Sequence, residues 1–331
     1  EHVSLLMMLS QTHARLGERA PAEACARDAV AIADGLRDDR MTAEAVMRLG
    51  SVLLDENPGE AVAMYGRAHG LFAKLDDKYG QVRCLINMGV AHSRLGDERA
   101  AEESYRAGYA LGVSAHAPDL AGLAALNLGV LHLKAGTHDA AVERVSEALR
   151  MFTACRSEPH RLAALYNLAH LARQAGELNS AAERYQATVE LARQLGQADV
   201  EIGAIAGLGL VGLALGRSPV ANGARQETLR LLAGREGWWF QGREVVEALA
   251  VHLALAEVGA AGALAQLEEV VERAARHDPY AAAWLLAECG PALHDAGASL
   301  VPLVDRWRNG TSLAPALDYG ALRDRLARLR S

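Results

Sequence analysis

Three asparagines stand 40 residues apart, at Asn87, Asn127 and Asn167. An asparagine carboxamide both donates and accepts hydrogen bonds, so it can pair with the peptide group of an extended ligand. Residues four and seven positions apart share one face of a helix, and this places Arg83 and Arg94 on the same face as Asn87. The spacing predicts a polar stripe along a helix, with the asparagine at its centre.

The stripe carries further polar or basic side chains in the next two copies. Lys134 lies seven residues after Asn127, and His170 lies three residues after Asn167. Basic groups beside a carboxamide favour an acidic segment or a C-terminal carboxylate as the ligand. A second interpretation is that duplication copied a structural asparagine that bonds a neighbouring turn. The sequence leaves both interpretations open.

The asparagines begin three similar segments, NMGVAHSRLGD (87–97), NLGVLHLKAGT (127–137) and NLAHLARQAGE (167–177). Self-similarity at a fixed period of about 20–50 residues indicates a repeat architecture. The turn after the first helix of each unit marks the register. These markers are Gly17, Asn57, Gly96, Gly136, Gly176, Gly216, Glu257 and Gly297. They predict eight helix pairs, and because no stretch shows the two-residue alternation of a strand, the expected fold class is all-α.

Each unit has one pattern for its first helix and another for its second. In the first helix an apolar stripe is expected to pack against neighbours, and in one unit it consists of Leu85, Met88, His92 and Leu95. In the second helix small residues flank a larger one, as in Ala101, Tyr105 and Gly108. Small residues at these positions let two helices approach closely.

These units resemble tetratricopeptide repeats (TPR). The family pattern of Asn-Leu-Gly, a Gly-Asp turn and then Ala and an aromatic residue is matched by Asn87–Gly89, Gly96–Asp97, Ala101 and Tyr105. The 40-residue period is similar to that of LGN/Pins-type adaptors and of the sensor arms of MalT-like bacterial regulators. The resemblance implies a right-handed superhelical solenoid whose first helices line a concave groove. Such a groove binds proteins or peptides and has no chemistry of its own.

The resemblance is strong over residues 1–216 and weaker beyond them. We expect a repeat array over residues 1–308, regular in 1–216 and degenerate in 217–308, followed by a C-terminal capping helix in 309–331. The sequence does not begin with Met. Together with the resemblance, this predicts the sensor or interaction arm of a larger bacterial regulatory protein.

Two patterns that could indicate a metal or a cofactor have simpler explanations. His13, His92 and His132 share one register position, but equivalent residues on neighbouring helices lie about 8–10 Å apart, too far to bind one zinc ion. They are expected at packing interfaces. Gly207, Gly209 and Gly212 form a GxGxxG pattern, which binds dinucleotides only between a strand and a helix. Inside a repeat helix, these glycines are expected to allow close helix contact or a local bend.

The aromatic cluster Trp238, Trp239 and Phe240 is a candidate secondary partner patch, because Trp is enriched in interface hot spots. Burial of at least two of these rings is the favoured alternative. The sequence contains no GxSxG, HExxH or P-loop motif. No cofactor and no catalytic activity are expected.

Composition narrows the class of partner and the compartment. The net charge is −7, which argues against a direct nucleic-acid partner. The four cysteines form no CxxC pair, so a reducing cytoplasm is expected. The longest uncharged run, residues 202–216, is too short and too rich in glycine for a membrane span. Self-association as a homo-oligomer is left open.

The leading prediction is therefore a non-catalytic module that binds an extended or acidic protein segment in the groove. The site is expected around the asparagines and their basic neighbours. The alternative is a structural or self-association scaffold, or an autoinhibitory spacer, whose groove is filled by its own chain. An enzyme with an unrecognised site ranks third.

Overall fold

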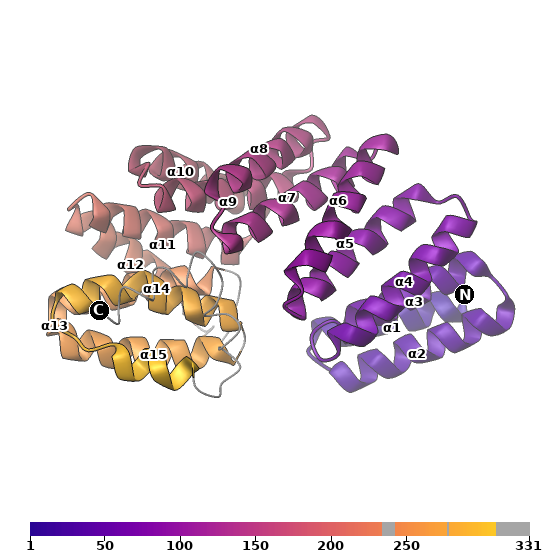
Figure 1. Ribbon diagram of the computed structural model, residues 1–331, viewed down its shortest axis with the longest axis horizontal. Helices are drawn as coiled ribbons and strands as arrows, with labels where there is room; N and C mark the ends of the chain where they lie inside the picture. The colour runs from indigo at the N-terminus through magenta and orange to yellow at the C-terminus, as the bar shows by residue number, and fades with distance from the viewer. Residues whose placement is uncertain (234–241, 277, 309–331) are drawn as a thin grey trace. The chain divides into compact units, whose positions relative to one another are not determined.

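The computed structural model describes residues 1–233, 242–276 and 278–308, and the regular structure in these residues is helical (Figure 1). The helices are α1 (His2–Arg15), α2 (Arg19–Leu36), α3 (Asp39–Leu53), α4 (Pro58–Lys74), α5 (Lys78–Arg94), α6 (Glu98–Ser114), α7 (Pro118–Ala135), α8 (His138–Ala154), α9 (Glu158–Gln174), α10 (Leu178–Leu195), α11 (Ala198–Ala214), α12 (Ser218–Leu232), α13 (Arg243–Ala275), α14 (Pro279–Asp295) and α15 (Val301–Arg308). The expected all-α class is confirmed. The predicted capping helix in 309–331 lies outside the described residues.

The helices form consecutive pairs that fit the eight expected repeats. In most pairs the turn between the two helices contains a glycine with positive φ. This conformation costs glycine little free energy because it has no Cβ. These glycines are Gly17, Gly96, Gly136, Gly176, Gly216, Gly259 and Gly297. Asn57 lies in the expected turn between α3 and α4, where it has a φ of −137° and caps the start of α4. One predicted marker was wrong, because the seventh turn is at Gly259 and not at Glu257.

Side-chain caps fix where several helices begin. Asp77 accepts a hydrogen bond from the backbone N–H of Gly80 at 2.8 Å, and Asp97 accepts one from Ala100 at 3.0 Å. Asp278 caps α14 through the N–H of Tyr280 at 2.9 Å, with Pro279 at the first helical position. These contacts satisfy donors that have no partner within the helix.

The small residue in the Asn-x-Gly motif makes room for an aromatic ring of the second helix. A Cβ on Gly89 would lie 2.5 Å from the ring of Tyr105, and a Cβ on Gly50 would lie 2.8 Å from the ring of Tyr65. Both tyrosines are buried. The pattern of small residues thus sets how closely the two helices of a pair pack.

The apolar stripe predicted for the first helix is only partly correct. Leu95 is 51% exposed because it follows the last residue of α5 and lies in the turn. The buried positions of α5 are Gly80, Val82, Cys84, Ile86, Gly89 and Ala91. The buried face is therefore broader than one row of residues.

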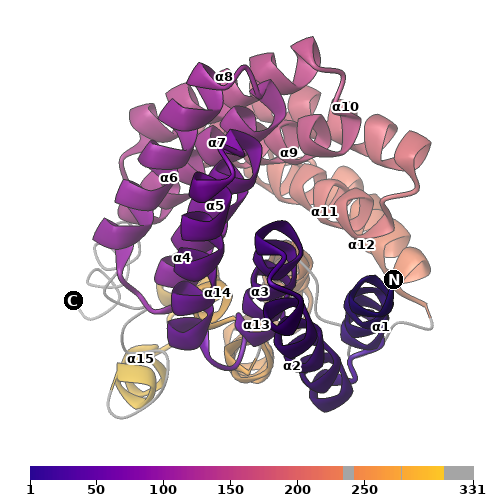
Figure 2. The same cartoon turned by 90° about the vertical axis from the view of Figure 1, so that its right-hand side faces the viewer.

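The chain divides into two compact units. Unit 1 comprises residues 1–131 and 150–155, and unit 2 comprises residues 132–149 and 156–331. In unit 1 each helix from α1 to α6 packs against the next (Figure 2). In unit 2 a single hydrophobic cluster joins α9 and α10 to α11, α13 and α14, with Tyr185, Leu249 and Leu285 among its members.

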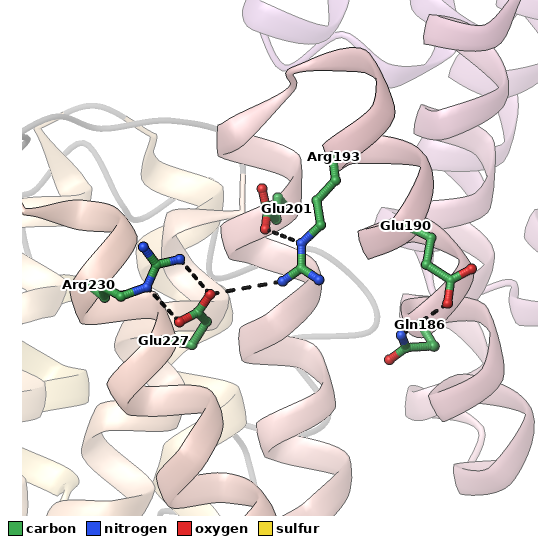
Figure 3. A network of polar contacts seen from close by, with 6 residues as sticks. All are labelled: Gln186, Glu190, Arg193, Glu201, Glu227 and Arg230. Atoms are coloured by element: carbon green, nitrogen blue, oxygen red, sulfur yellow. Dashed lines mark hydrogen bonds and ion pairs between the residues drawn. The ribbon is translucent and has the colours of Figure 1, made fainter.

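Ion pairs connect successive repeats on the surface. In unit 2, Arg193 of α10 contacts Glu201 of α11 at 2.7 Å and Glu227 of α12 at 3.9 Å (Figure 3). A hydrogen bond from Arg230 lowers the pKa of the Glu227 carboxyl. Exposed pairs of this kind contribute little to stability, so packing, and not charge, holds the repeats together.

Helix α13 is the one helix among the described residues that is long and apolar enough to cross a membrane by length and composition. Gly259, with φ 78° and ψ 179°, interrupts it and separates residues 243–258 from residues 260–275. Val245, Leu249 and Leu267 of α13 are buried in the core of unit 2. The helix therefore has the form of a repeat pair with a very short turn.

Candidate ligand-binding site

The first helices of unit 1 form a pocket of about 400 Å³. It is lined by Ser4, Met7, Met8, Gln11, Glu44, Met47, Arg48, Ser51, Arg83 and Asn87. These residues come from α1, α3 and α5, the first helices of three successive pairs. Two of the predicted binding residues, Arg83 and Asn87, therefore lie in one pocket.

The pocket also contains residues of α1 and α3, two helices for which no stripe residues were predicted. On α5 the lining residues are Arg83 and Asn87, four positions apart. On α3 the same register gives Glu44 and Arg48, each 39 residues earlier. A search for repeated asparagines does not find these positions, because the residue type at a given register position differs between repeats. Counting back one repeat from Asn87 would have identified Arg48.

Three methionines provide the apolar part of the pocket. Met47 is buried, whereas Met8 is 66% exposed at the pocket edge. Met7 lies beside them as a half-buried residue. Methionine is flexible and polarisable, so it can fit apolar side chains of different shapes. This part of the pocket suits an apolar group of a ligand.

The basic residues of unit 1 differ in how they are paired. Arg83 contacts Glu44 at 3.2 Å, and Arg94 contacts Asp55 at 3.5 Å. Among the described residues no carboxylate pairs with Arg48, whose Nη2 donates a long 3.5 Å hydrogen bond to Gln11 and whose buried Nε has no partner. The pocket therefore contains one arginine with capacity to bind an acceptor.

The other predicted binding residues lie outside this pocket. Asn127 is half-buried on α7. Asn167 turns back on its own helix, since its Nδ2 donates to the carbonyl of Ala163 at 2.8 Å. In unit 2, Lys134 Nζ lies 4.8 Å from the centroid of the Tyr280 ring, and the His170 ring lies 5.6 Å from Trp284. The cluster Trp238, Trp239 and Phe240 falls outside the described residues.

The histidine row lies near the turns between paired helices. His13 Nδ1 pairs with Glu18, the residue that precedes α2. His132 Nδ1 lies 3.0 Å from Thr137 Oγ1. The buried Nδ1 of His92 has no hydrogen-bond partner among the described residues. Two of the three histidines thus contact the turn of their own repeat.

The glycines of the GxGxxG pattern are packing positions inside α11. A Cβ on Gly207 would lie 2.4 Å from the Tyr185 ring, and one on Gly209 would lie 2.6 Å from Leu249. The close-contact interpretation is confirmed.

Burial raises the pKa of the Cys84 thiol on α5 to about 12, which keeps the thiol protonated and unreactive as a nucleophile.

Comparison with known proteins supports the repeat assignment. Residues 121–194 match the family model of the tetratricopeptide repeat. No curated protein matches the sequence.

Solved structures with the same fold cover most of the chain. A Rap protein complexed with Competence and Sporulation Factor is similar over 99% of this chain and 98% of its own, with a TM-score of 0.56 and 13% identity. Aspartyl phosphate phosphatase F from Bacillus subtilis is similar over 82% and 70%, with a TM-score of 0.66 and 13% identity. A Signal Transduction ATPase with Numerous Domains from Pyrococcus horikoshii, which has a tetratricopeptide repeat sensor, is similar over 91% and 43%, with a TM-score of 0.61 and 14% identity. The chain therefore has a TPR-like helical solenoid fold.

Proposed function

We propose that the chain is a non-catalytic module that binds a protein or peptide segment in the pocket formed by α1, α3 and α5. The observation that carries the proposal is the pocket itself, which combines flexible methionines with Arg48 and Asn87. Apolar surroundings with a few oriented polar groups are the usual composition of a ligand site.

The pocket chemistry favours a ligand that combines an apolar side chain with an acidic group. The apolar group would contact Met8 and Met47, and a carboxylate would pair with Arg48. Asn87 can bond a peptide group through both its donor and its acceptor. Arg83 is a weaker candidate for direct contact with the ligand, because Glu44 already pairs with it.

We further propose a regulatory role, as the sensor or interaction arm of a larger protein in the cytoplasm. The similar structures include a Rap protein with a bound factor and a signalling ATPase with a repeat sensor. The four cysteines are free thiols, which suits a reducing compartment.

Selection from a displayed peptide library against the immobilised chain tests the binding proposal. Fluorescence anisotropy then measures the selected peptides with the wild type and with the double variant Arg48→Ala/Asn87→Ala. We expect at least about a tenfold loss of affinity, since a charge-assisted bond and an amide bond are removed together.

The matched control is Arg99→Ala, which removes a guanidinium from an 89% exposed side chain of α6. Its affinity should equal that of the wild type. The proposal fails if no peptide is enriched, or if the double variant binds the selected peptides as tightly as the control does.

A further inference from the structure

Helix α14 contacts, within unit 2, the stripe that the sequence assigns to ligands. Tyr280, Trp284 and Glu288 are spaced four residues apart and share one face of α14. They meet Lys134 and Arg173 of unit 2. The ring of Tyr280 lies 4.8 Å from Lys134 Nζ, and the Glu288 carboxylate lies 2.6 Å from Arg173 Nη1.

Trp284 occupies the centre of this contact. Its ring lies 5.6 Å from the His170 ring and 5.8 Å from Arg173 Cζ. Its side chain is almost fully buried. Both His170 and Lys134 belong to the predicted ligand stripe, and Arg173 lies three residues after His170. The chain's own helix therefore binds the side chains that an external ligand would use.

The contact is unusually polar for a buried interface. The side chains of Arg173 and Glu288 are only 10% and 9% exposed. Burial disfavours the charged guanidinium, but the Glu288 carboxylate and the Tyr185 hydroxyl together outweigh this effect and raise the pKa of Arg173. Trp284 Nε1 is buried without a hydrogen-bond partner among the described residues.

An unsatisfied buried donor makes this contact less favourable than an apolar one of equal size. The backbone of α14 packs most extensively along α13, where Ala281, Leu285 and Cys289 are buried. Its link to α9 consists of long side chains that bridge the two helices. The α9 contact is therefore the interface of α14 that can open at the lower cost.

We propose that α14 is an autoinhibitory helix that occupies the ligand stripe of unit 2 in the closed state. When α14 moves away from α9, the stripe residues Lys134 and His170, together with the neighbouring Arg173, become available to a partner. The partner that fits is a helical segment with an aromatic residue followed four positions later by a carboxylate, the pattern of Trp284 and Glu288. This inference does not depend on the pocket of unit 1.

Hydrogen exchange measured by mass spectrometry on the full chain tests the closed state. Glu288→Gln weakens the contact with Arg173 and should raise exchange in residues 279–295 and 163–174 by about tenfold or more. Residues 178–232 should keep wild-type exchange. The control is Glu272→Gln, which alters a 65% exposed carboxylate of α13 paired with Arg276, and it should change neither segment.

A milder variant guards against loss of folding. Lys134→Ala/His170→Ala removes the edge contacts without leaving a buried charge, and it should raise exchange in residues 279–295 alone. The proposal is overturned if all of unit 2 exchanges faster together in either variant. It is also overturned if residues 279–295 remain as well protected from hydrogen exchange as α11 in both variants.

A labelled synthetic peptide with the sequence of residues 279–295 tests the partner chemistry. We expect it to bind full-length Glu288→Gln about tenfold tighter than the wild type, because the resident helix competes less well. The same peptide with alanine in place of its tryptophan and the glutamate four residues later should not bind. Equal affinity for the two proteins, or equal binding of the two peptides, would contradict the proposal.

Discussion

The first helices of the two units share a repeat register but differ in what covers their stripe. In unit 1 the stripe of α1, α3 and α5 opens into a pocket lined by long side chains, among them Met8, Arg48 and Asn87. In unit 2 the side chains of α9 contact α14, and α11 packs against α13. One stripe is open, and the other is occupied by the chain's own helices.

Side-chain size and charge explain this difference better than helix geometry does. On α11, Gly203 lies against Gly242, since a Cβ on Gly203 would be 3.5 Å from the Gly242 Cα, and Gly209 lies against Leu249 of α13. Glycine lets another helix approach closely. In unit 1 the register position of Gly203 is occupied by Arg83, whereas that of Gly209 is again a glycine, Gly89. The bulky charged side chain at the first of these positions disfavours the same close approach of a neighbouring helix. The same repeat can thus serve as a binding surface or as a core.

The largest predicted effect is the difference in stability lost when Arg173 of unit 2 or Arg83 of unit 1 is replaced by alanine. Arg173→Ala leaves the buried Glu288 without its partner and should destabilise the contact between α9 and α14 by about 3–5 kcal/mol. Arg83→Ala removes a pair in which both side chains are 37% exposed, and it should cost at most about 1 kcal/mol. Trp284 is buried in unit 2, and residues 1–131 and 150–155 of unit 1 contain no tryptophan, so urea titrations followed by tryptophan emission do not report on unit 1. Equal losses for the two variants would remove the distinction between an open and an occupied stripe.

The next effect concerns the pH dependence of unit 2. Burial raises the pKa of the Glu244 carboxyl to about 7, although its Oε2 accepts a hydrogen bond from the Gly242 N–H at 3.1 Å. The folded state therefore favours the protonated form. That stabilisation is complete below the unfolded pKa of 4.5 and is lost as the pH rises through about 7.

Glu244→Gln is neutral at every pH and should avoid this loss. We expect the variant to exceed the wild type in stability by up to about 3 kcal/mol at pH 8 and to match it at pH 4. Urea midpoints from tryptophan emission at the two pH values measure the difference. A difference that does not change with pH would show that the carboxyl does not titrate as described.

A third prediction concerns packing that the two units have in common. A Cβ on Gly89 of unit 1 or Gly207 of unit 2 would lie within 2.5 Å of a tyrosine ring. Either Gly→Ala change should therefore cost about 1–3 kcal/mol. Gly70→Ala, on α4 with nothing within 4 Å of its Cβ, should instead stabilise by about 0.5–1 kcal/mol. Thermal unfolding followed by circular dichroism measures all three, and tolerance of alanine at Gly207 alone would show that packing in unit 2 is looser.

Local sequence patterns predicted most of the fold. The 40-residue register located the helix pairs, because turn glycines and small packing residues obey short-range rules that a sequence displays. The register also placed Arg83 and Asn87 on one face, and both line the pocket of unit 1. It failed at Glu257, because the seventh turn is very short and lies two residues later, at Gly259.

The rest of the site depends on contacts between distant residues. Arg48 and Met8 were missed because they occupy the asparagine position without sharing its chemistry. The contact between Arg173 and Glu288 joins residues 115 positions apart, and no periodic pattern indicates it. The sequence could raise the alternative of a self-filled groove, but it could not show which stripe was filled.

The smallest effect on stability, and the sharpest comparison of the stripes, comes from two asparagines in the same register. Asn87→Ala and Asn167→Ala should each change stability by no more than about 0.5 kcal/mol, because alanine is the better helix former and neither carboxamide is fully buried. Affinity should separate them. Asn87 lines the pocket, whereas the side chain of Asn167 already donates to the carbonyl of Ala163. Only Asn87→Ala should therefore weaken binding of the peptides selected from the library. If Asn167→Ala weakens binding of these peptides equally, the ligand reaches the stripe of unit 2, and α14 does not exclude the ligand from that stripe.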